Sequence, residues 1–476
     1  GRAATGALLR RILLTRALAV LLVCAALYFI TPPLTAWLRG LGLPGALSLI
    51  AALHVPSFNA LALPLVLYVA GTGMMNILGA LFTALLRTRL TLVVGGLAQV
   101  GNVAGVYIAA RLGYGVAGVI WALGLVTWAA AAVYLVLLLP LLRAKDAAVP
   151  SSEATAFTPV LRLGATAWLT NLISGALLKQ SAVSLMQYFF VAAASIGFFN
   201  LAFQLSHAAA FLLIAGLGGV GMAAMAAAFS GEDRAGLGVA WRSVSKAQML
   251  LAVPVLTFCF IQADTIAVLL YGPQFTAVGV LMQVFLVFNV VQRIAGGGSH
   301  QAALYVLGRQ TWAFAAQVIG LLLTIVIGAL LIPQKGTFGG PGGALIAVGA
   351  GQVVVELLQL ALAWRMLRRA YPIQFGLRVL LALAPALLVT AALRLDVTSA
   401  LSGLGASGTS VALTNAINLL LSGIIFTAVF IGGMLLARPI EADDVALLAQ
   451  LNPRLRPILT PFAHRAAPLS TNDPDA

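Results

Sequence analysis

Long apolar runs follow one another along nearly the whole chain, separated by short polar segments. A helix of about 20 apolar residues crosses the roughly 30 Å hydrocarbon core of a bilayer, and most of the runs approach or exceed that length. Because a helix satisfies its own backbone hydrogen bonds in lipid, the pattern predicts an all-α polytopic membrane protein. About twelve spans are expected, at 12–30, 58–86, 90–110, 115–142, 163–190, 193–229, 247–270, 276–304, 311–332, 342–367, 378–394 and 412–437.

The composition supports a lipid environment. Hydrophobic residues make up 62% of the 476 positions and charged residues 8%, whereas ordinary globular chains have about 45–50% and about 25%. So few charges exclude a soluble domain. The net charge of +15 would suit a nucleic-acid binder, but the basic residues stand singly or in pairs at span ends and form no long basic stretch. The expected partner is therefore the lipid bilayer, with no nucleic acid.

Lys and Arg are distributed unevenly between the two sides of the membrane. With the N-terminus inside, 21 of the 27 fall in the cytoplasm, four fall outside and two lie within spans. Cytoplasmic loops carry the excess of positive charge in multi-pass proteins. The skew therefore predicts a protein of the inner (plasma) membrane with both termini in the cytoplasm.

Two segments of the chain resemble each other. Residues 84–118 and 303–346 each contain a basic cytoplasmic turn, an apolar span and a Gly-rich external turn, in the same orientation. Such a parallel repeat is typical of transporters with two lobes. When the spans of the two repeats are paired in order, the spans at 163–190 and 193–229 have no counterparts in the first lobe. We therefore expect an N-terminal truncation that removes two helices of the first lobe. The expected divisions are a first lobe of four spans at 1–143, a cytoplasmic linker at 144–160, a second lobe of six spans at 161–369, two extra spans at 370–437 and a cytoplasmic tail at 438–476.

Three ionisable residues, Lys179, Arg293 and Glu356, are predicted to lie deep within spans. Such a side chain costs about 2.5–3.5 kcal/mol on insertion scales, so it usually faces a cavity and serves a function. Several Asn and Gln residues and one His are spaced so that they lie on the same face of a helix, in two cases together with Arg293 or Glu356. They are Asn200, Gln204 and His207, then Asn289 and Gln292 beside Arg293, and Gln352 and Gln359 beside Glu356. Amides hydrogen-bond sugar hydroxyls and cations neutralise phosphate, so we predict a substrate site of Lys179, Arg293, Glu356, Asn200, Gln204 and Asn289.

Structural roles for the same residues stay open at this point. Asn and Gln inside bundles often bind only neighbouring helices. A second interpretation of Lys179 and Arg293 is that they pair with Glu356 or extend to the membrane interface. The Gly-rich stretch 296–298 is interpreted as interhelical packing or a helix kink. No metal-ligand spacing, nucleotide fingerprint or catalytic constellation occurs in the sequence, so no metal, no cofactor and no enzymatic activity are predicted.

Four short runs resemble sequences of a known family. They are G-F-F-N-L-A at 197–202, L-L-Y-G-P-Q-F at 269–275, G-Y-G-V-A-G at 113–118 and R-P-I-E-A-D-D-V from 438. On these runs the chain is similar to Wzx-type polysaccharide flippases, in the multidrug/oligosaccharidyl-lipid/polysaccharide exporter superfamily. The resemblance implies fourteen helices in two six-helix lobes plus two further helices, which move by alternating access, and it places the family's cavity cations at Lys179 and Arg293. The sequence departs from the family in having Ser181 and Val183 where an acidic residue often follows the cation.

Three functions are compatible with the sequence. The leading interpretation is translocation of a lipid-linked (polyprenyl-pyrophosphate) oligosaccharide for cell-surface polysaccharide biosynthesis, with glycosyltransferases or a polymerase of the same pathway as partners. The alternative is a proton- or sodium-coupled multidrug extruder, which would favour an acidic cavity. A membrane glycosyltransferase or ligase is the third, but the long external loop near 31–57 contains no acid. The sequence specifies neither the glycan, nor the coupling ion, nor the oligomeric state.

Overall fold

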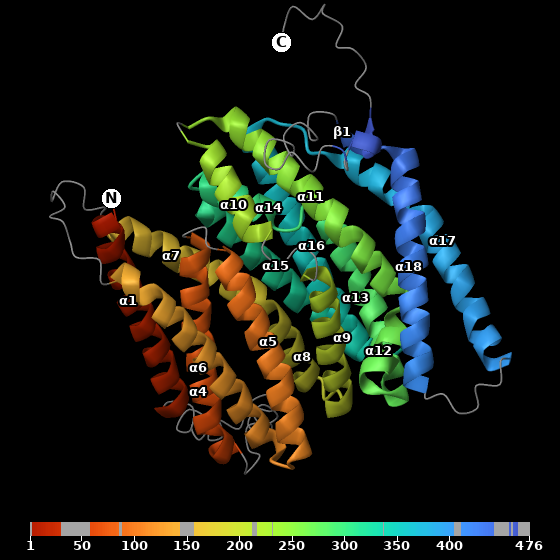
Figure 1. Ribbon diagram of the computed structural model, residues 1–476, viewed down its shortest axis with the longest axis horizontal. Coiled ribbons are helices and arrows are strands. Elements are labelled where there is room, and N and C mark those ends of the chain that lie inside the picture. The colour runs from red at the N-terminus through yellow and green to blue at the C-terminus, as the bar shows by residue number, and fades with distance from the viewer. Residues whose placement is uncertain are drawn as a thin grey trace, which may run out of the picture. The chain divides into compact units, whose positions relative to one another are not determined.

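The computed structural model describes residues 2–29, 58–84, 88–142, 157–211, 217–230, 232–336, 338–403, 411–441, 457 and 460–464 (Figure 1). Nearly all of the described residues are helical; the others lie in short connections and in two strands of two residues each. The chain forms two compact units, Gly1–Val160 and Leu161–Ala476. The all-α prediction is therefore confirmed.

The first unit is a bundle of long apolar helices. Its core joins three of them through Leu78 and Phe82, through Val94, and through Tyr134 and Leu138. Two helices approach each other closely at Gly71, where a Cβ atom would lie 2.6 Å from Thr127 Oγ1. Absence of a side chain at this position thus lets two helices pack tightly. The helices are α1 (Arg2–Phe29), α4 (Phe58–Ala84), α5 (Thr88–Arg111) and α6 (Gly115–Leu142).

The second unit contains several helices that are broken inside what the sequence presents as one apolar run. A π-helical turn, η2 (Ile173–Leu177), joins α7 (Phe157–Leu172) to α8 (Leu178–Tyr188). The other helices are α9 (Ala193–Phe211), α10 (Leu217–Ala228), α11 (Arg234–Ile261), α12 (Ala263–Tyr271), α13 (Thr276–Ile294), α14 (Ser299–Val306), α15 (Gln310–Leu331), α16 (Gly340–Leu367), α17 (Ile373–Gly403) and α18 (Val411–Ala437). Two 3-10 turns, η3 (Pro273–Phe275) and η4 (Thr460–Phe462), and the parallel pair β1 (Ile440–Glu441) and β2 (Ala463–His464) complete the unit.

The hydrophobic core of the second unit surrounds its broken helices. The largest buried cluster draws side chains from α8, α9, α11, α12, α13 and α16, including Met186, Phe199, Leu256, Phe285 and Leu345. A second cluster joins α11, α17 and α18 and reaches the chain beyond α18 through Ile440 and Phe462. Helix α13 packs in the first cluster through Phe285 and against the second through Val290 and Ile294, which fixes the position of its polar residues.

In each of the twelve predicted spans, most of the described residues are helical. Within the described part of the chain, nine helices are long and apolar enough to cross a membrane, and Leu13–Ala26 is a shorter apolar segment. Large apolar side chains cover the outside of these helices, with Leu97 68%, Val103 71% and Leu388 73% exposed. Such a surface would aggregate in water, but lipid solvates it. The chain is thus a multi-pass membrane protein.

Several helix boundaries differ from the predicted spans. Helix α11 begins at Arg234, well before the predicted start at 247, because the Asp233 side chain caps it by accepting a hydrogen bond from Ala235 N at 2.9 Å. Helix α17 runs beyond 378–394 at both ends, since helical backbone continues after the apolar pattern stops. Helix α7 begins at Phe157, inside the predicted linker 144–160, and residues 144–156 lie outside the described part. The same holds for the external loop 31–57 and for most of the tail.

Candidate functional site

The run Gly296–Gly298 breaks the predicted span 276–304 into α13 and α14. All three glycines have positive φ, at 120°, 51° and 92°, a region that side chains with a Cβ atom rarely adopt. The turn closes on α13 through Gly296 N to Arg293 O at 3.1 Å and Gly297 N to Gln292 O at 3.0 Å. The kink interpretation of this stretch is therefore confirmed.

Side chains from other elements satisfy the carbonyl groups that this break exposes. The Tyr371 hydroxyl donates to Ile294 O at 2.6 Å. The Gln248 amide, with Nε2 oriented toward the turn, donates to the carbonyl oxygens of Gly296 and Gly297 at 2.9 Å each. Burial, together with the negative charge of Glu356, raises the pKa of Tyr371 above its usual value, so the hydroxyl keeps its proton and remains a donor.

His300 holds the other side of the break. Its Nε2 lies within hydrogen-bond distance of Ala295 O, and its Nδ1 accepts a hydrogen bond from Trp241 Nε1 at 2.9 Å. Both ring nitrogens are thus used, which fixes a neutral tautomer with the proton on Nε2. Because a buried helix end without partners would be costly, this set of hydrogen bonds stabilises a discontinuous helix within the membrane unit.

Arg293 and Glu356 meet at this break. The Arg293 guanidinium donates from Nη1 to Gly297 O at 3.0 Å, and the Glu356 carboxylate accepts from Gly298 N at 3.1 Å through Oε2. The Gln292 side chain also hydrogen-bonds Glu356, and Arg293 acts on Glu356 through its charge. Both charged residues are buried, with exposed fractions of 7% and 6%. The carboxylate therefore lies at the N-terminus of α14, where a helix dipole favours an anion.

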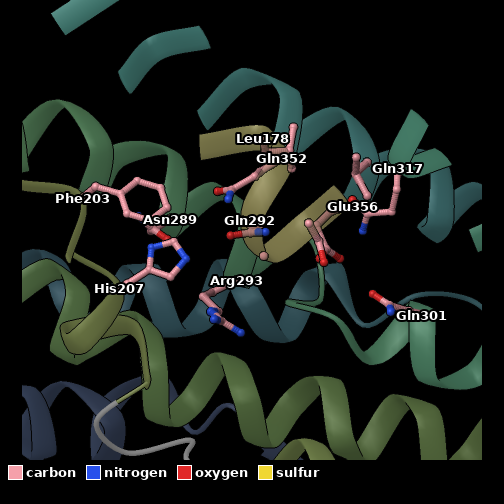
Figure 2. A pocket seen from close by; sticks show the side chains of 13 residues that line it. Leu178, Phe203, His207, Asn289, Gln292, Arg293, Gln301, Gln317, Gln352 and Glu356 are labelled. Carbon is pink, nitrogen blue, oxygen red and sulfur yellow. The ribbon is translucent and has the colours of Figure 1, made fainter. Parts of the chain in front are cut away.

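These groups line a cavity of about 390 Å³ in the second unit (Figure 2). Figure 2 shows Phe203 and His207 on one side, Glu356, Gln301 and Gln317 on the other, and Gln292 and Arg293 between them. The lining is rich in amides. It consists of Ser174, Gly175, Leu178, Phe203, His207, Asn289, Gln292, Arg293, Gln301, Gln317, Gln352, Val355 and Glu356.

Basic and aromatic side chains gather on one side of the cavity. The Lys179 ammonium lies 5.2 Å from the centre of the Phe203 ring. His207 stacks on Phe203, with ring centres 4.3 Å apart, and more distantly on Phe285 at 5.9 Å. The charges of both Lys179 and Arg293 act on His207. Lys179 therefore brings a positive charge to this side, Glu356 brings a carboxylate to the other side, and Arg293 lies between them.

The structure brings four of the six predicted site residues together. Arg293, Glu356 and Asn289 line the cavity, and Lys179 lies against one of its walls at Phe203. Asn200 and Gln204 are not among the lining residues. The Asn200 amide donates to Ile196 O of its own helix at 3.0 Å, and Gln204 is exposed. The shared helical face predicted for Asn200, Gln204 and His207 thus brings only His207 to the cavity.

Four polar or small lining residues were not predicted. Ser174 and Gly175 belong to the π-helical turn η2, which carries no pattern that separates it from an ordinary helix. Gln301 follows the glycine run, and Gln317 stands alone in the apolar span of α15. A single amide within an otherwise apolar run was the available signal for Gln317, which is 5% exposed.

Comparison with known proteins shows likeness at the level of the fold. No protein-family model matches the sequence, and no curated protein matches it. Lipid II flippase MurJ in an inward closed conformation matches with a TM-score of 0.56 and 13% identity, over 89% of this chain and 83% of that chain. An inward-facing MATE multidrug transporter of the MOP superfamily matches with a TM-score of 0.53 and 16% identity, over 77% and 86%. The Vibrio cholerae MATE transporter VcmN in its bent form gives a TM-score of 0.51 and 16% identity, over 75% and 78%. The chain therefore has the polytopic helical fold of these transporters.

Proposed function

We propose that this protein moves a lipid-linked oligosaccharide across the plasma membrane by alternating access, for the synthesis of a cell-surface polysaccharide. The substrate is a glycan joined by a pyrophosphate to a polyprenyl tail. The observation that carries the proposal is Arg293, a buried cation at a helix break that opens into an amide-lined cavity. Guanidinium groups bind phosphate in a bidentate manner, and amides bind sugar hydroxyls.

The size of the cavity limits what it can hold. Its volume of about 390 Å³ lies within the roughly 300–1,000 Å³ typical of small-molecule sites. A complete oligosaccharide exceeds such a volume, so the cavity would take the phosphorylated head. In this proposal the unit Gly1–Val160 contains the first lobe, and the unit Leu161–Ala476 contains the second lobe and the two extra helices. Both termini face the cytoplasm, where glycosyltransferases of the pathway would load the carrier.

Multidrug extrusion is the second candidate, favoured by one observation. Glu356 places a carboxylate in the cavity, and carboxylates attract cationic drugs. The solved structures with this fold include MATE multidrug transporters. Arg293 and Lys179 oppose this candidate, since two positive charges beside the same cavity repel a cation.

Replacing Lys179 with alanine is expected to lower glycan export by about ten- to hundredfold. A hydrogen bond to a charged group contributes about 1.5–3 kcal/mol, which corresponds to that range. Lys179→Arg keeps the charge and should retain most of the export. The measurement is the amount of surface polysaccharide in a cell whose own flippase has been deleted.

The matched control is Lys335→Ala, which removes the same charge from an exposed position after α15 and should leave export unchanged. Equal export by Lys179→Ala and Lys335→Ala would show that Lys179 does not serve the substrate, and the predicted role of the basic side of the cavity would be wrong.

A further inference from the structure

Glu356 occupies the hydrogen-bond donors that an anionic headgroup would need. Its carboxylate accepts from the backbone N–H of Gly298 at 3.1 Å and from the side chain of Gln292, and it lies within the field of Arg293. These are a helix N-terminus, an amide and a guanidinium, which together form an anion-binding site. In the empty protein the occupant of that site is therefore a side chain of the protein itself.

We propose that Glu356 is an internal anion that holds the phosphate site in the empty protein, and that a phosphorylated headgroup enters it only as Glu356 takes up a proton. The inference rests on the proposed function, because it takes an anionic headgroup as the ligand. The proton comes from water, joins a carboxylate oxygen of Glu356 when the headgroup binds and returns to water when the headgroup leaves. One proton is thus bound for each headgroup.

Electrostatic repulsion gives the reason for this linkage. A carboxylate and a phosphate that share a cavity of about 390 Å³ lie within several ångströms of each other. At roughly 6 Å and an effective dielectric constant of about 20, two like charges repel enough to weaken binding about a hundredfold. A proton on Glu356 removes that repulsion. The protonated carboxyl also releases the Gly298 N–H and Gln292 to the ligand.

The charged and titratable groups around Glu356 come from several elements. Arg293 on α13 acts on it through its positive charge, and the uncharged Tyr371 hydroxyl, between α16 and α17, lies within the field of the Glu356 carboxylate. On α14, both ring nitrogens of His300 are already engaged with Ala295 and Trp241. The lining residue of α15 is the uncharged Gln317.

The remaining elements that pack on α16 carry bases. Lys179 on α8 and His207 on α9 lie at the opposite side of the cavity, and on α11 Lys246 lies against Phe375, 5.8 Å from the ring centre. Among the described residues that line the cavity, Glu356 is the only acid. His207 is the other described lining residue of a type that commonly accepts a proton, so it must be tested as a competing proton acceptor.

The test is binding of methyl farnesyl diphosphate to the purified full chain, measured by calorimetry across a range from mildly acidic to mildly alkaline buffers. This diphosphate diester keeps its two negative charges over the whole range, so any pH dependence belongs to the protein. For the wild type we expect affinity to rise as the pH falls, with uptake of one proton per ligand seen from the heat in buffers of different ionisation enthalpy.

Glu356→Gln keeps the shape of the protonated side chain and removes the negative charge. It should bind the diester about a hundredfold more tightly than the wild type at mildly alkaline pH, without pH dependence and without proton uptake. The matched control Glu232→Gln makes the same substitution at an exposed position and should behave as the wild type. His207→Gln should keep the pH dependence.

The possible outcomes separate this inference from the proposed function. Tight but pH-independent binding by the wild type, or pH dependence that disappears in His207→Gln and persists in Glu356→Gln, would overturn the role of Glu356 while leaving the flippase proposal intact. No binding of the diester by the wild type or by Glu356→Gln would overturn the proposed function, and this inference with it.

Discussion

Arg293→Ala is expected to abolish glycan export and to destabilise the protein by about 3–5 kcal/mol. Arg293 and Glu356 are buried charges that act on each other at the helix break. Removing one of two buried, interacting charges leaves the other uncompensated, and losses of that size are typical. Arg293 also holds the turn through Gly297 O. The thermal midpoint in detergent and the surface polysaccharide of complemented cells measure the two effects.

A double variant separates folding from transport. Arg293→Ala combined with Glu356→Gln removes both charges, so most of the lost stability should return. Export should stay absent, because the phosphate ligand is still missing. Arg293→Lys retains the charge without the planar fork and should support reduced export. If the double variant exported glycan at the wild-type rate, Arg293 would be a structural residue and the site would be assigned wrongly.

Gly296→Ala is the second change with a large expected effect. Gly296 has φ of 120°, a conformation nearly confined to glycine, and an added Cβ atom would collide with the His300 ring. Backbone strain of this kind costs about 1–3 kcal/mol before any collision. We expect the thermal midpoint to fall sharply and export to be lost, because the turn that carries Gly297 O and Gly298 N can no longer form.

Gly308→Ala is the matched control at the other end of α14. Gly308 also has positive φ, at 69°, but no atom lies within 4 Å of its added Cβ atom. The substitution should therefore lower the free energy of unfolding by about 1–2 kcal/mol, the cost of a left-handed backbone conformation for alanine, and leave export measurable. Equal losses in the two variants would mean that the helix break has no special role.

The apolar pattern predicted the helices well because the lipid environment requires long apolar runs. Each span must present apolar side chains to hydrocarbon, so runs such as 115–142 translate into a helix, α6, with nearly the same bounds. Structural features that depend on hydrogen bonding could not be predicted from the apolar pattern. The extension of α11 to Arg234 is set by the Asp233 cap, and η2 is a change in backbone bonding that no residue pattern marks.

Charge was a more reliable signal for the candidate site than the presence of an amide. The cost of burying Arg293 and Glu356 in a membrane made them visible from the sequence, and both line the cavity. Asn200 and Asn289 each donate to a carbonyl oxygen four residues back in their own helix, yet Asn289 is a lining residue and Asn200 is not. Gln301 reaches the cavity because the glycine turn redirects the chain. Helical spacing alone does not distinguish these cases, since it does not reveal a break in the helix.

Translocation by the purified protein in vesicles tests the central claim most directly. Vesicles would carry a short-chain prenyl diphosphate glycan on one leaflet, with a lectin in the opposite compartment to detect molecules that cross. We expect the protein to move this lipid, to move a neutral prenyl glycoside of the same length poorly, and to leave a cationic dye in place. Transport of the dye without transport of the diphosphate glycan, or equal transport of the charged and neutral lipids, would contradict the claim that buried cations in this cavity recognise a phosphorylated head.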